Sequence, residues 1–227
     1  MIAKNPFLTA IDVVKSLHTQ GISRCSKTIY NYFKKLLISK KKAYHVCSQR
    51  YNPEKERIFK ETMKECVSDN LISLDECYFS EKVLPHYGYA KKGCRIKTGL
   101  LPPEWQKRSL LLAVSSAGEY NYEIYEGSVN KLMFESFVQS MNPKEGDKVL
   151  LDNVAFHHGI ECPHFIFTPP YQPMYNPVEY CFSKIKHAFR QMAMSSLSVE
   201  DKIHKAIQSL TPYDITHCFQ HVTKLLT

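Results

Sequence analysis

The apolar run at residues 110–114 (LLLAV) most limits how this chain of 227 residues can fold. A strand that is apolar at consecutive positions needs cover on both faces. Segments 71–79 (LISLDECYF) and 120–127 (YNYEIYEG) also have strand patterns, and short apolar strands at 148–151 and 164–168 alternate with predicted helices. This order of elements predicts an α/β fold in which a mixed sheet is flanked by helices.

Apolar residues recur at helical spacing in several other segments. The pattern predicts helices at 8–18, 26–37, 53–67, 131–141, 176–190, 199–210 and 212–225. No apolar stretch approaches the roughly 18 residues that a membrane span needs, and the first residues lack the apolar core of a secretory signal. We therefore expect an intracellular protein that does not engage a membrane.

Positive charge is concentrated at the beginning of the chain. Residues 1–50 contain ten Lys or Arg residues and one acid, which gives a net charge of +9, whereas the remaining 177 residues contain twenty bases and twenty-one acids. Such segregation favours a polyanion-binding module joined to a near-neutral body. The alternative is a basic face that is merely solvated.

The two helices predicted at 8–18 and 26–37 are separated by a short segment containing Gly21, a pattern typical of a helix-turn-helix. Ser26 is the expected N-cap of the second helix. In this motif the start of the second helix reads the DNA major groove and nearby lysines bind phosphates. The expected groove-facing residues are Lys27, Thr28, Tyr30 and Asn31, and the expected phosphate-binding residues are Lys34, Lys35, Lys40, Lys41 and Lys42. A small helical bundle of another kind would show the same spacing.

Three acids follow or begin predicted elements. Asp75 follows the strand residues LISL, Asp152 follows KVLL, and Glu179 lies in the first turn of the helix after YNP. Carboxylates gathered at one sheet edge resist full ionisation unless a cation neutralises them, and oxygen ligands favour Mg²⁺ or Mn²⁺. Two such ions, about 3.5–4 Å apart, suit phosphodiester displacement.

Each acid also has an ordinary interpretation. Asp75 and the next residue could begin a turn, and Asp152 with Asn153 could form an Asx-turn. Glu179, with Asn176 as N-cap, could belong to a capping box.

Eight cysteines are scattered along the chain without a CxxC pair. In a chain without a secretory signal, we interpret them as reduced thiols, several of them core residues.

Two blocks of the sequence closely resemble the mariner-like superfamily of DDE transposases, which includes related bacterial insertion-sequence transposases. The blocks are LLDNVAFHHG and FTPPYQPMYNPVEYCFSKIK, and SLDECYFSE is similar to the family's first block. The matching positions in the second and third blocks are Asp152, Asn153, His157, Pro169, Pro170, Tyr171, Pro173, Asn176, Pro177 and Glu179. The segment SKTIYNYFKKL is similar to the recognition helix of the family's helix-turn-helix.

The resemblance implies a ribonuclease-H-like fold preceded by a small helix-turn-helix domain. It implies that Asp75, Asp152 and Glu179 form a catalytic triad that binds two Mg²⁺ or Mn²⁺ ions. Asn153, His157 and Asn176 would support this site. Lys184, Lys186 and Arg190, on the helix that carries Glu179, would bind phosphates; the alternative is a solvated helix face. The implied domains are a DNA-binding segment at 1–50, a connector helix at 51–69 and a catalytic domain at 70–227.

The implied activity is cleavage of double-stranded DNA at transposon ends and joining to target DNA, carried out by a homodimer or larger assembly. The family usually has two helix-turn-helix units, and this chain has room for one, as expected of an N-terminally truncated member. Asp152 and Glu179 are also closer in sequence than is usual, so a tight loop is expected between them. A catalytically inactive DNA-binding relative and a simple nuclease of the same fold are the alternatives.

Overall fold

The structure is a computed structural model that describes residues 5–40, 51–66, 70–80, 89–95, 107–160, 162–193 and 195–226. The chain divides into two compact units, Met1–His45 and Val46–Thr227. Within the part of the chain that is described, no helix is both long and apolar enough to cross a membrane.

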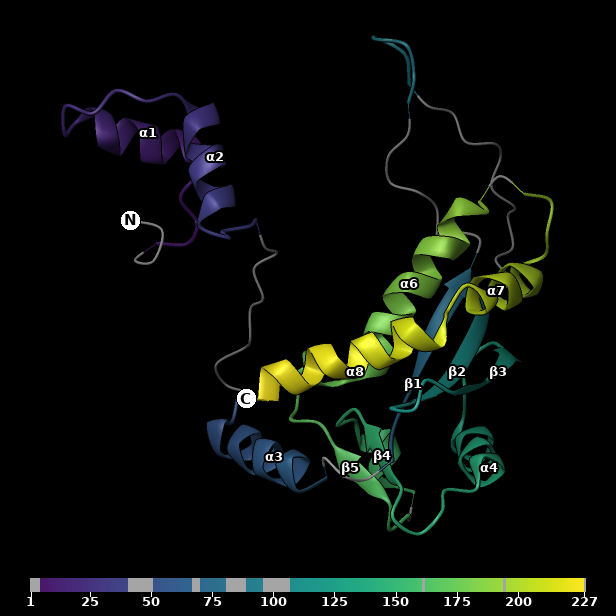
Figure 1. The fold of residues 1–227 in the computed structure, drawn as a ribbon. Helices are drawn as coiled ribbons and strands as arrows, with labels where there is room; N and C mark the ends of the chain where they lie inside the picture. The colour runs from purple at the N-terminus through teal and green to yellow at the C-terminus, as the bar shows by residue number, and fades with distance from the viewer. Residues whose placement is uncertain are drawn as a thin grey trace. The chain divides into compact units, whose positions relative to one another are not determined.

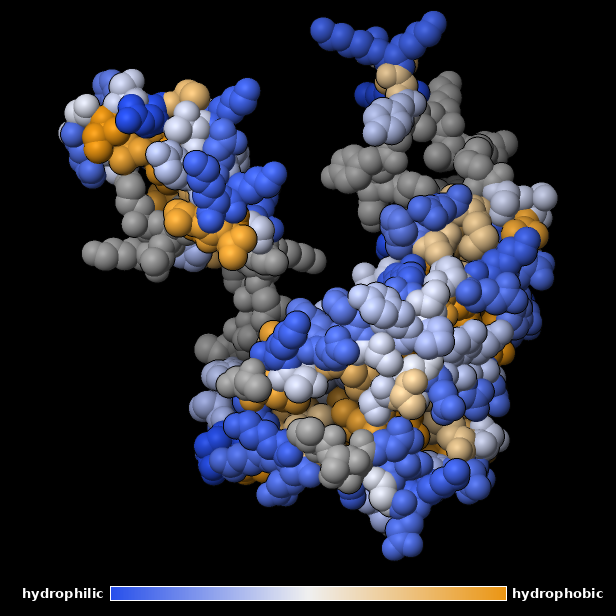
Figure 2. All heavy atoms as spheres, viewed as in Figure 1, coloured by the Kyte–Doolittle hydropathy of each residue, from blue (hydrophilic) through white to orange (hydrophobic). Residues whose placement is uncertain are grey.

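The N-terminal unit contains two helices, α1 (Ala10–His18) and α2 (Ser26–Lys35) (Figure 1). Thr9 caps α1 in a capping box with Asp12. The core of this unit is small: its buried residues are Ala10, Val13 and Ile29, and several large apolar side chains stay exposed, as Figure 2 shows. The N-cap of α2 is Cys25 and not Ser26, because the extended backbone conformation ends at Cys25.

The second unit is built on a five-stranded sheet with strand order β3-β2-β1-β4-β5. The strands are β1 (Leu71–Ser80), β2 (Lys107–Ser115), β3 (Tyr120–Glu126), β4 (Lys148–Leu151) and β5 (Phe165–Phe167). The first three strands are antiparallel, and β4 and β5 run parallel to β1. The sheet is therefore mixed, as the order of elements predicted.

Three helices, α6 (Pro177–Gln191), α7 (Val199–Gln208) and α8 (Pro212–Leu226), cover one face of the sheet (Figure 1). Leu110, Leu112 and Val114 of β2 pack into this core. Gly118, in the turn after β2, has a φ of +91°, and a Cβ there would lie 3.0 Å from Pro212, so the turn requires glycine where α8 begins.

The opposite face is covered by α4 (Lys131–Met141), which contributes Phe134 and Phe137. Leu111 and Ala113 of β2 point into this second core. Consecutive residues of the run 110–114 are therefore buried on opposite faces, which confirms the prediction from its uninterrupted apolar character.

The predicted connector helix is α3 (Pro53–Glu65), which begins with Asn52 as a side-chain N-cap and Pro53 in the first turn. Its buried residues Phe59 and Met63 pack with Tyr175 and with Val222 of α8. This helix is thus part of the packed second unit. Two short elements, α5 (Ala155–His158) and the 3-10 helix η2 (Pro173–Tyr175), complete the structure.

Candidate active site

Asp75 lies in the middle of β1 and not at its end, which corrects the expected boundary. The strand continues through Cys77 and Phe79, whose buried side chains join the core beneath α6. Asp75 pairs with Leu112 of β2 and is only 6% exposed. The alternative interpretation of this segment as a turn is therefore wrong.

Asp152 follows β4 directly, as predicted. Ser73 of β1 is paired with Leu150 of β4 in parallel register. Asp75 and Asp152 each lie two residues beyond this pair, and the negative charge of Asp152 acts on Asp75. Two acids separated by 77 positions in the sequence are therefore neighbours at the C-terminal end of β4.

His157 is buried beside Asp152. Its Nδ1 lies 2.7 Å from Asp152 Oδ1 and 3.3 Å from the Asp152 backbone oxygen, and its ring packs against Phe134. Burial lowers the pKa of His157, but the hydrogen bond and negative charge of Asp152 outweigh burial, so the net pKa is raised. The single helical turn α5 presents His157 to Asp152, and His158 Nε2 lies 2.8 Å from Asn153 Oδ1.

The third acid, Glu179, lies half-buried in the first turn of α6. Asn176 is the N-cap residue by backbone position, but its side chain makes no capping hydrogen bond. The capping box, the alternative interpretation of Glu179, is therefore absent. The Asn176 side chain instead points to β1, where its Oδ1 accepts from the Ser73 hydroxyl at 2.5 Å and its Nδ2 lies 3.5 Å from Asp75 Oδ2.

Ser73, and not Asn176, provides the side-chain hydrogen bond at the start of α6. Its Oγ accepts the backbone N–H of Val178 at 2.9 Å while its hydroxyl donates to Asn176. Ser73, Asn176 and Val178 are all fully buried. We call these hydrogen bonds the β1–α6 junction. They hold the strand that carries Asp75 against the helix that carries Glu179.

Ser73 was not among the residues predicted from the sequence. The available signal was its position two residues before Asp75, because residues i and i+2 of a strand share a face. A serine on the buried face of an otherwise apolar strand needs a hydrogen-bond partner, and the helix start provides it.

A cavity of about 430 Å³ opens where these elements meet. It is lined by Asp152, Asn153, Val154, Thr168, Tyr171, Gln172, Pro173, Asn176 and Glu179. Asp75 does not line this cavity, but its Oδ2 lies 3.5 Å from the Nδ2 of Asn176, which does. Tyr171 has a φ of +61°, a conformation that costs on the order of 1 kcal/mol in a non-glycine residue and is concentrated at functional sites.

The three carboxylates repel one another. Burial, followed by the negative charges of Asp152 and Glu179, raises the pKa of Asp75 to about 8. Burial also raises the pKa of Glu179, with Asp152 adding to the effect and Lys186 opposing it. A cluster of this kind is stabilised by a proton or by a cation.

The donor set fits Mg²⁺ or Mn²⁺, which prefer oxygen ligands and would neutralise the repulsion at Asp75. Over the described ranges, however, no three Asp, Glu, His or Cys side chains lie close enough together to ligate one ion. The carboxylates share one region without forming a closed coordination shell.

A second support comes from α3. Glu56 accepts hydrogen bonds from the Tyr175 hydroxyl at 2.6 Å and from Gln172 Nε2 at 3.3 Å. Tyr175 and Gln172 belong to the segment between β5 and α6 that lines the cavity. Glu56 was not predicted from the sequence, because its partners lie more than one hundred residues away.

The predicted DNA-binding residues differ in their surroundings. In the N-terminal unit, the exposed ones are Lys27, Tyr30, Asn31, Lys34, Lys35 and Lys40. Thr28 is half-buried, and its Oγ1 contacts Cys25 Sγ. Lys41 and Lys42 lie outside the described residues. In the second unit, Lys184 is ion-paired with Asp214 and lines a different cavity from Glu179. Lys186 acts electrostatically on Glu179 and lies over the Phe182 ring.

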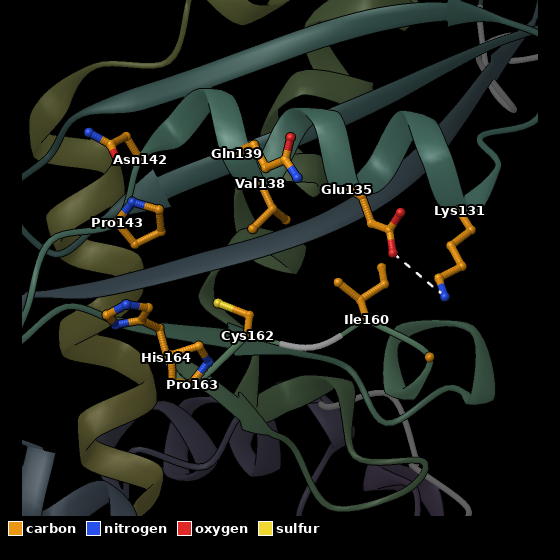
Figure 3. Close-up of a pocket in the computed structure, with 11 residues that line it drawn as sticks. Lys131, Glu135, Val138, Gln139, Asn142, Pro143, Ile160, Cys162, Pro163 and His164 are labelled. Atoms are coloured by element: carbon orange, nitrogen blue, oxygen red, sulfur yellow. Dashed lines mark ion pairs between the residues drawn. The ribbon is translucent and has the colours of Figure 1, made fainter.

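A larger cavity, of about 710 Å³, lies between α4 and the segment that follows α5 (Figure 3). Its rim carries the Lys131–Glu135 ion pair, with 3.6 Å between Nζ and Oε1. Asp75, Asp152 and Glu179 do not line it. The carboxylate chemistry therefore belongs to the smaller cavity.

Replacing Ser73 by alanine tests the β1–α6 junction. The Ser73→Ala change leaves the buried Val178 N–H and Asn176 Oδ1 without Ser73, so we expect unfolding free energy to fall by about 2–4 kcal/mol in urea denaturation. Ser183→Ala, at an exposed serine of α6, is the matched control and should change stability by less than about 0.5 kcal/mol. Equal effects of the two changes would contradict the junction.

The raised pKa of Asp75 predicts how stability depends on pH without metal. Folded Asp75 keeps its proton up to about pH 8, whereas the unfolded carboxyl loses it near its ordinary value of about 4. Stability contributed by protonated Asp75 is therefore complete below about pH 4 and is lost as pH rises to about 8.

Thermal unfolding in EDTA between pH 4 and 8 measures this loss. We expect Asp75→Asn to flatten the pH dependence and Glu145→Gln, at an exposed acid, to retain it. A wild-type profile as flat as that of Asp75→Asn would show that Asp75 titrates normally.

The sequence profile described as DDE superfamily endonuclease matches residues 70–200. No curated protein matches this chain significantly. The matched region runs from the start of β1 to the start of α7, so it contains all three acids.

The fold is similar to solved structures of Mos1 transposase. The Mos1 transposase paired-end complex with left transposon end has a TM-score of 0.60 at 15% identity, covering 99% of this chain and 74% of that chain. The Mos1 mariner paired end complex with Mn gives 0.58 at 16% identity, with the same coverage. The catalytic domain of Mos1 mariner transposase gives 0.53 at 13% identity, covering 81% of this chain and 91% of that chain.

At these identities the similarity to Mos1 is one of fold, and it confirms the expected ribonuclease-H-like sheet flanked by helices. The profile match spans more than half of the chain. A strand-borne Asp75 beside Asp152, with Glu179 at a helix start, agrees with that match. This chain therefore belongs to the DDE superfamily of endonucleases.

Proposed function

We propose that this protein is a metal-dependent transposase that cuts double-stranded DNA at transposon ends and joins the freed end to target DNA. The observation that carries the proposal is the convergence of Asp75, Asp152 and Glu179, which come from β1, the end of β4 and the start of α6. Membership of the DDE endonuclease superfamily supports a nuclease reaction.

The three carboxylates would hold one or two Mg²⁺ or Mn²⁺ ions. Bound divalent metal supplies Lewis-acid activation of the attacking oxygen and stabilisation of the leaving oxygen in phosphodiester displacement. The chain supplies the oxygen ligands and their placement. His157 orients Asp152, while the β1–α6 junction orients Asp75 and Glu179.

The proposed reaction is a direct displacement at phosphorus. Water breaks the bond to the 3′-oxygen and frees a 3′-hydroxyl, which then attacks a phosphodiester of the target. Neither step requires a covalent enzyme intermediate, so the protein needs no Ser, Tyr or Cys nucleophile. Lys186, whose positive charge acts on Glu179, would contribute positive charge to a DNA phosphate.

Double-stranded DNA is the proposed partner, and the N-terminal unit is its proposed binding module. The exposed Lys27, Lys34, Lys35 and Lys40 on and after α2 support phosphate binding. The paired-end complexes of Mos1 contain a transposon end, and we extend that partner to this chain as part of the proposal. That the protein acts inside the cell as a homodimer or larger assembly remains a prediction.

Metal binding and cleavage test the catalytic proposal together. We expect calorimetry to detect Mn²⁺ binding by the wild type and by Glu145→Gln, and greatly weakened binding by Asp152→Asn and Glu179→Gln. In Mn²⁺, nicking of supercoiled plasmid should fall at least about 100-fold in these two variants.

Three other outcomes would contradict parts of the proposal. Plasmid nicking without joining of a pre-cut duplex end to plasmid indicates a simple nuclease. DNA binding without metal binding or nicking indicates an inactive DNA-binding relative. If the Asp152→Asn variant nicks plasmid as fast as the wild type, Asp152 is not part of the catalytic site.

Salt dependence tests the DNA-binding module. With about six phosphate contacts, the affinity of the full chain for duplex DNA should fall with a log–log salt slope near −5. Combined Lys34→Ala and Lys35→Ala changes should reduce the slope by about two, because each lysine neutralises one phosphate. Lys205→Ala, at an exposed lysine of α7, is the control. A salt-independent affinity would contradict the assignment.

A further inference from the structure

Two cysteines from different helices are in contact on the side of α6 that faces α8. Cys181 Sγ of α6 lies 3.8 Å from Cys218 Sγ of α8 and donates its S–H to it. Cys181 is completely buried, and Cys218 is partly exposed. Both thiols line a cavity of about 340 Å³, separate from the cavity of Asp152 and Glu179.

Charged neighbours distinguish the two thiols. The hydrogen bond from Cys181 lowers the pKa of Cys218, and the positive charge of Lys184 acts in the same direction, against burial and Asp214. The partly exposed Cys218 is therefore the more reactive of the two sulfurs.

This arrangement is that of a reacting thiol and a resolving thiol. Cys218 is the partly exposed sulfur that a small oxidant reaches first. The buried partner is already in contact with it and needs no diffusion to complete a disulfide. A metal site is less well supported, because among the described residues no three Cys, His, Asp or Glu side chains form a ligand cluster.

We propose that Cys181 and Cys218 are a redox modification site, at which hydrogen peroxide drives a reversible disulfide between α6 and α8. The Cys218 thiolate attacks one peroxide oxygen, forming a sulfenic acid and releasing hydroxide, which takes up a proton to become water. The Cys181 sulfur, losing its proton, then attacks the Cys218 sulfur and displaces the hydroxyl as a second water. Two thiols are oxidised by two electrons, and one peroxide is reduced to two waters.

The disulfide would change how α6 packs against α8 in the second unit. A disulfide brings the two sulfurs to about 2.05 Å, so the side chains must rotate and α6 and α8 must adjust slightly. Glu179 is two residues before Cys181, and α8 also packs with α3 through Val222. The bond would join segments 37 positions apart in the sequence and reduce the entropy of the unfolded chain.

Peptide mapping of the full chain tests the proposal. The reduced protein is treated with hydrogen peroxide, free thiols are blocked with N-ethylmaleimide, and tryptic peptides are analysed by mass spectrometry. We expect peptides 149–184 and 206–224 to be linked, with loss of two hydrogens, and dithiothreitol to separate them. Oxidation should raise the thermal unfolding midpoint by roughly 5–10 °C.

Cysteine variants identify which two cysteines form the disulfide. Peptide 149–184 also contains Cys162, so Cys162→Ser should preserve the link, whereas Cys218→Ser should abolish both the link and the increase in midpoint. Cys25, an exposed thiol whose pKa is lowered by its hydrogen bond with Thr28, serves as the internal measure of oxidant exposure.

Two results would overturn the proposal. One is recovery of Cys181 and Cys218 as alkylated thiols under conditions that oxidise Cys25. The other is a Cys218 linked to a different cysteine in the wild type. Neither result depends on the folding of a variant, because both are read from the unmodified chain.

Discussion

The hydrogen bonds of Ser73 at the start of α6 are the interaction on which the candidate site most depends. Ser73 Oγ receives the Val178 N–H and its hydroxyl donates to Asn176, so the helix begins against the centre of the sheet. A helix start has unpaired N–H groups that must be satisfied when buried. Here a strand side chain satisfies one of them, and the amide that would normally cap the helix turns toward Asp75.

The same junction explains why acids can occupy such a buried place. Asp75 lies in a strand whose neighbours pack beneath α6, and burial together with nearby carboxylates raises its pKa. A buried, mutually repelling set of acids reduces stability unless protons or cations compensate. The cost is understandable if the protein holds these carboxylates ready for divalent metal, as we propose for a DDE endonuclease. His157 and Glu56 extend the support to Asp152 and to the segment before α6.

Several parts of this structure were predictable because the signal was local. The run 110–114 predicted a strand buried on both faces, and Leu110 and Leu111 indeed pack into opposite cores. Helical spacing predicted α4 at its observed bounds, and KVLL predicted β4. The errors were also local in origin. Asp75 looked like the end of a strand because acids are unfavourable within buried strands, and Asn176 looked like a capping side chain because its sequence neighbours form that motif.

The sequence by itself determined the class of fold, the concentration of positive charge in the first fifth of the chain, and the three acids as candidate ligands. Only the tertiary structure placed Asp75 beside Asp152, because a parallel register joins strands 77 residues apart. The partnerships of Ser73 with α6, of Glu56 with Tyr175 and of Cys181 with Cys218 were likewise decided by packing. Periodicity and capping depend on residues a few positions apart, whereas these contacts depend on which faces meet when the helices close over the sheet.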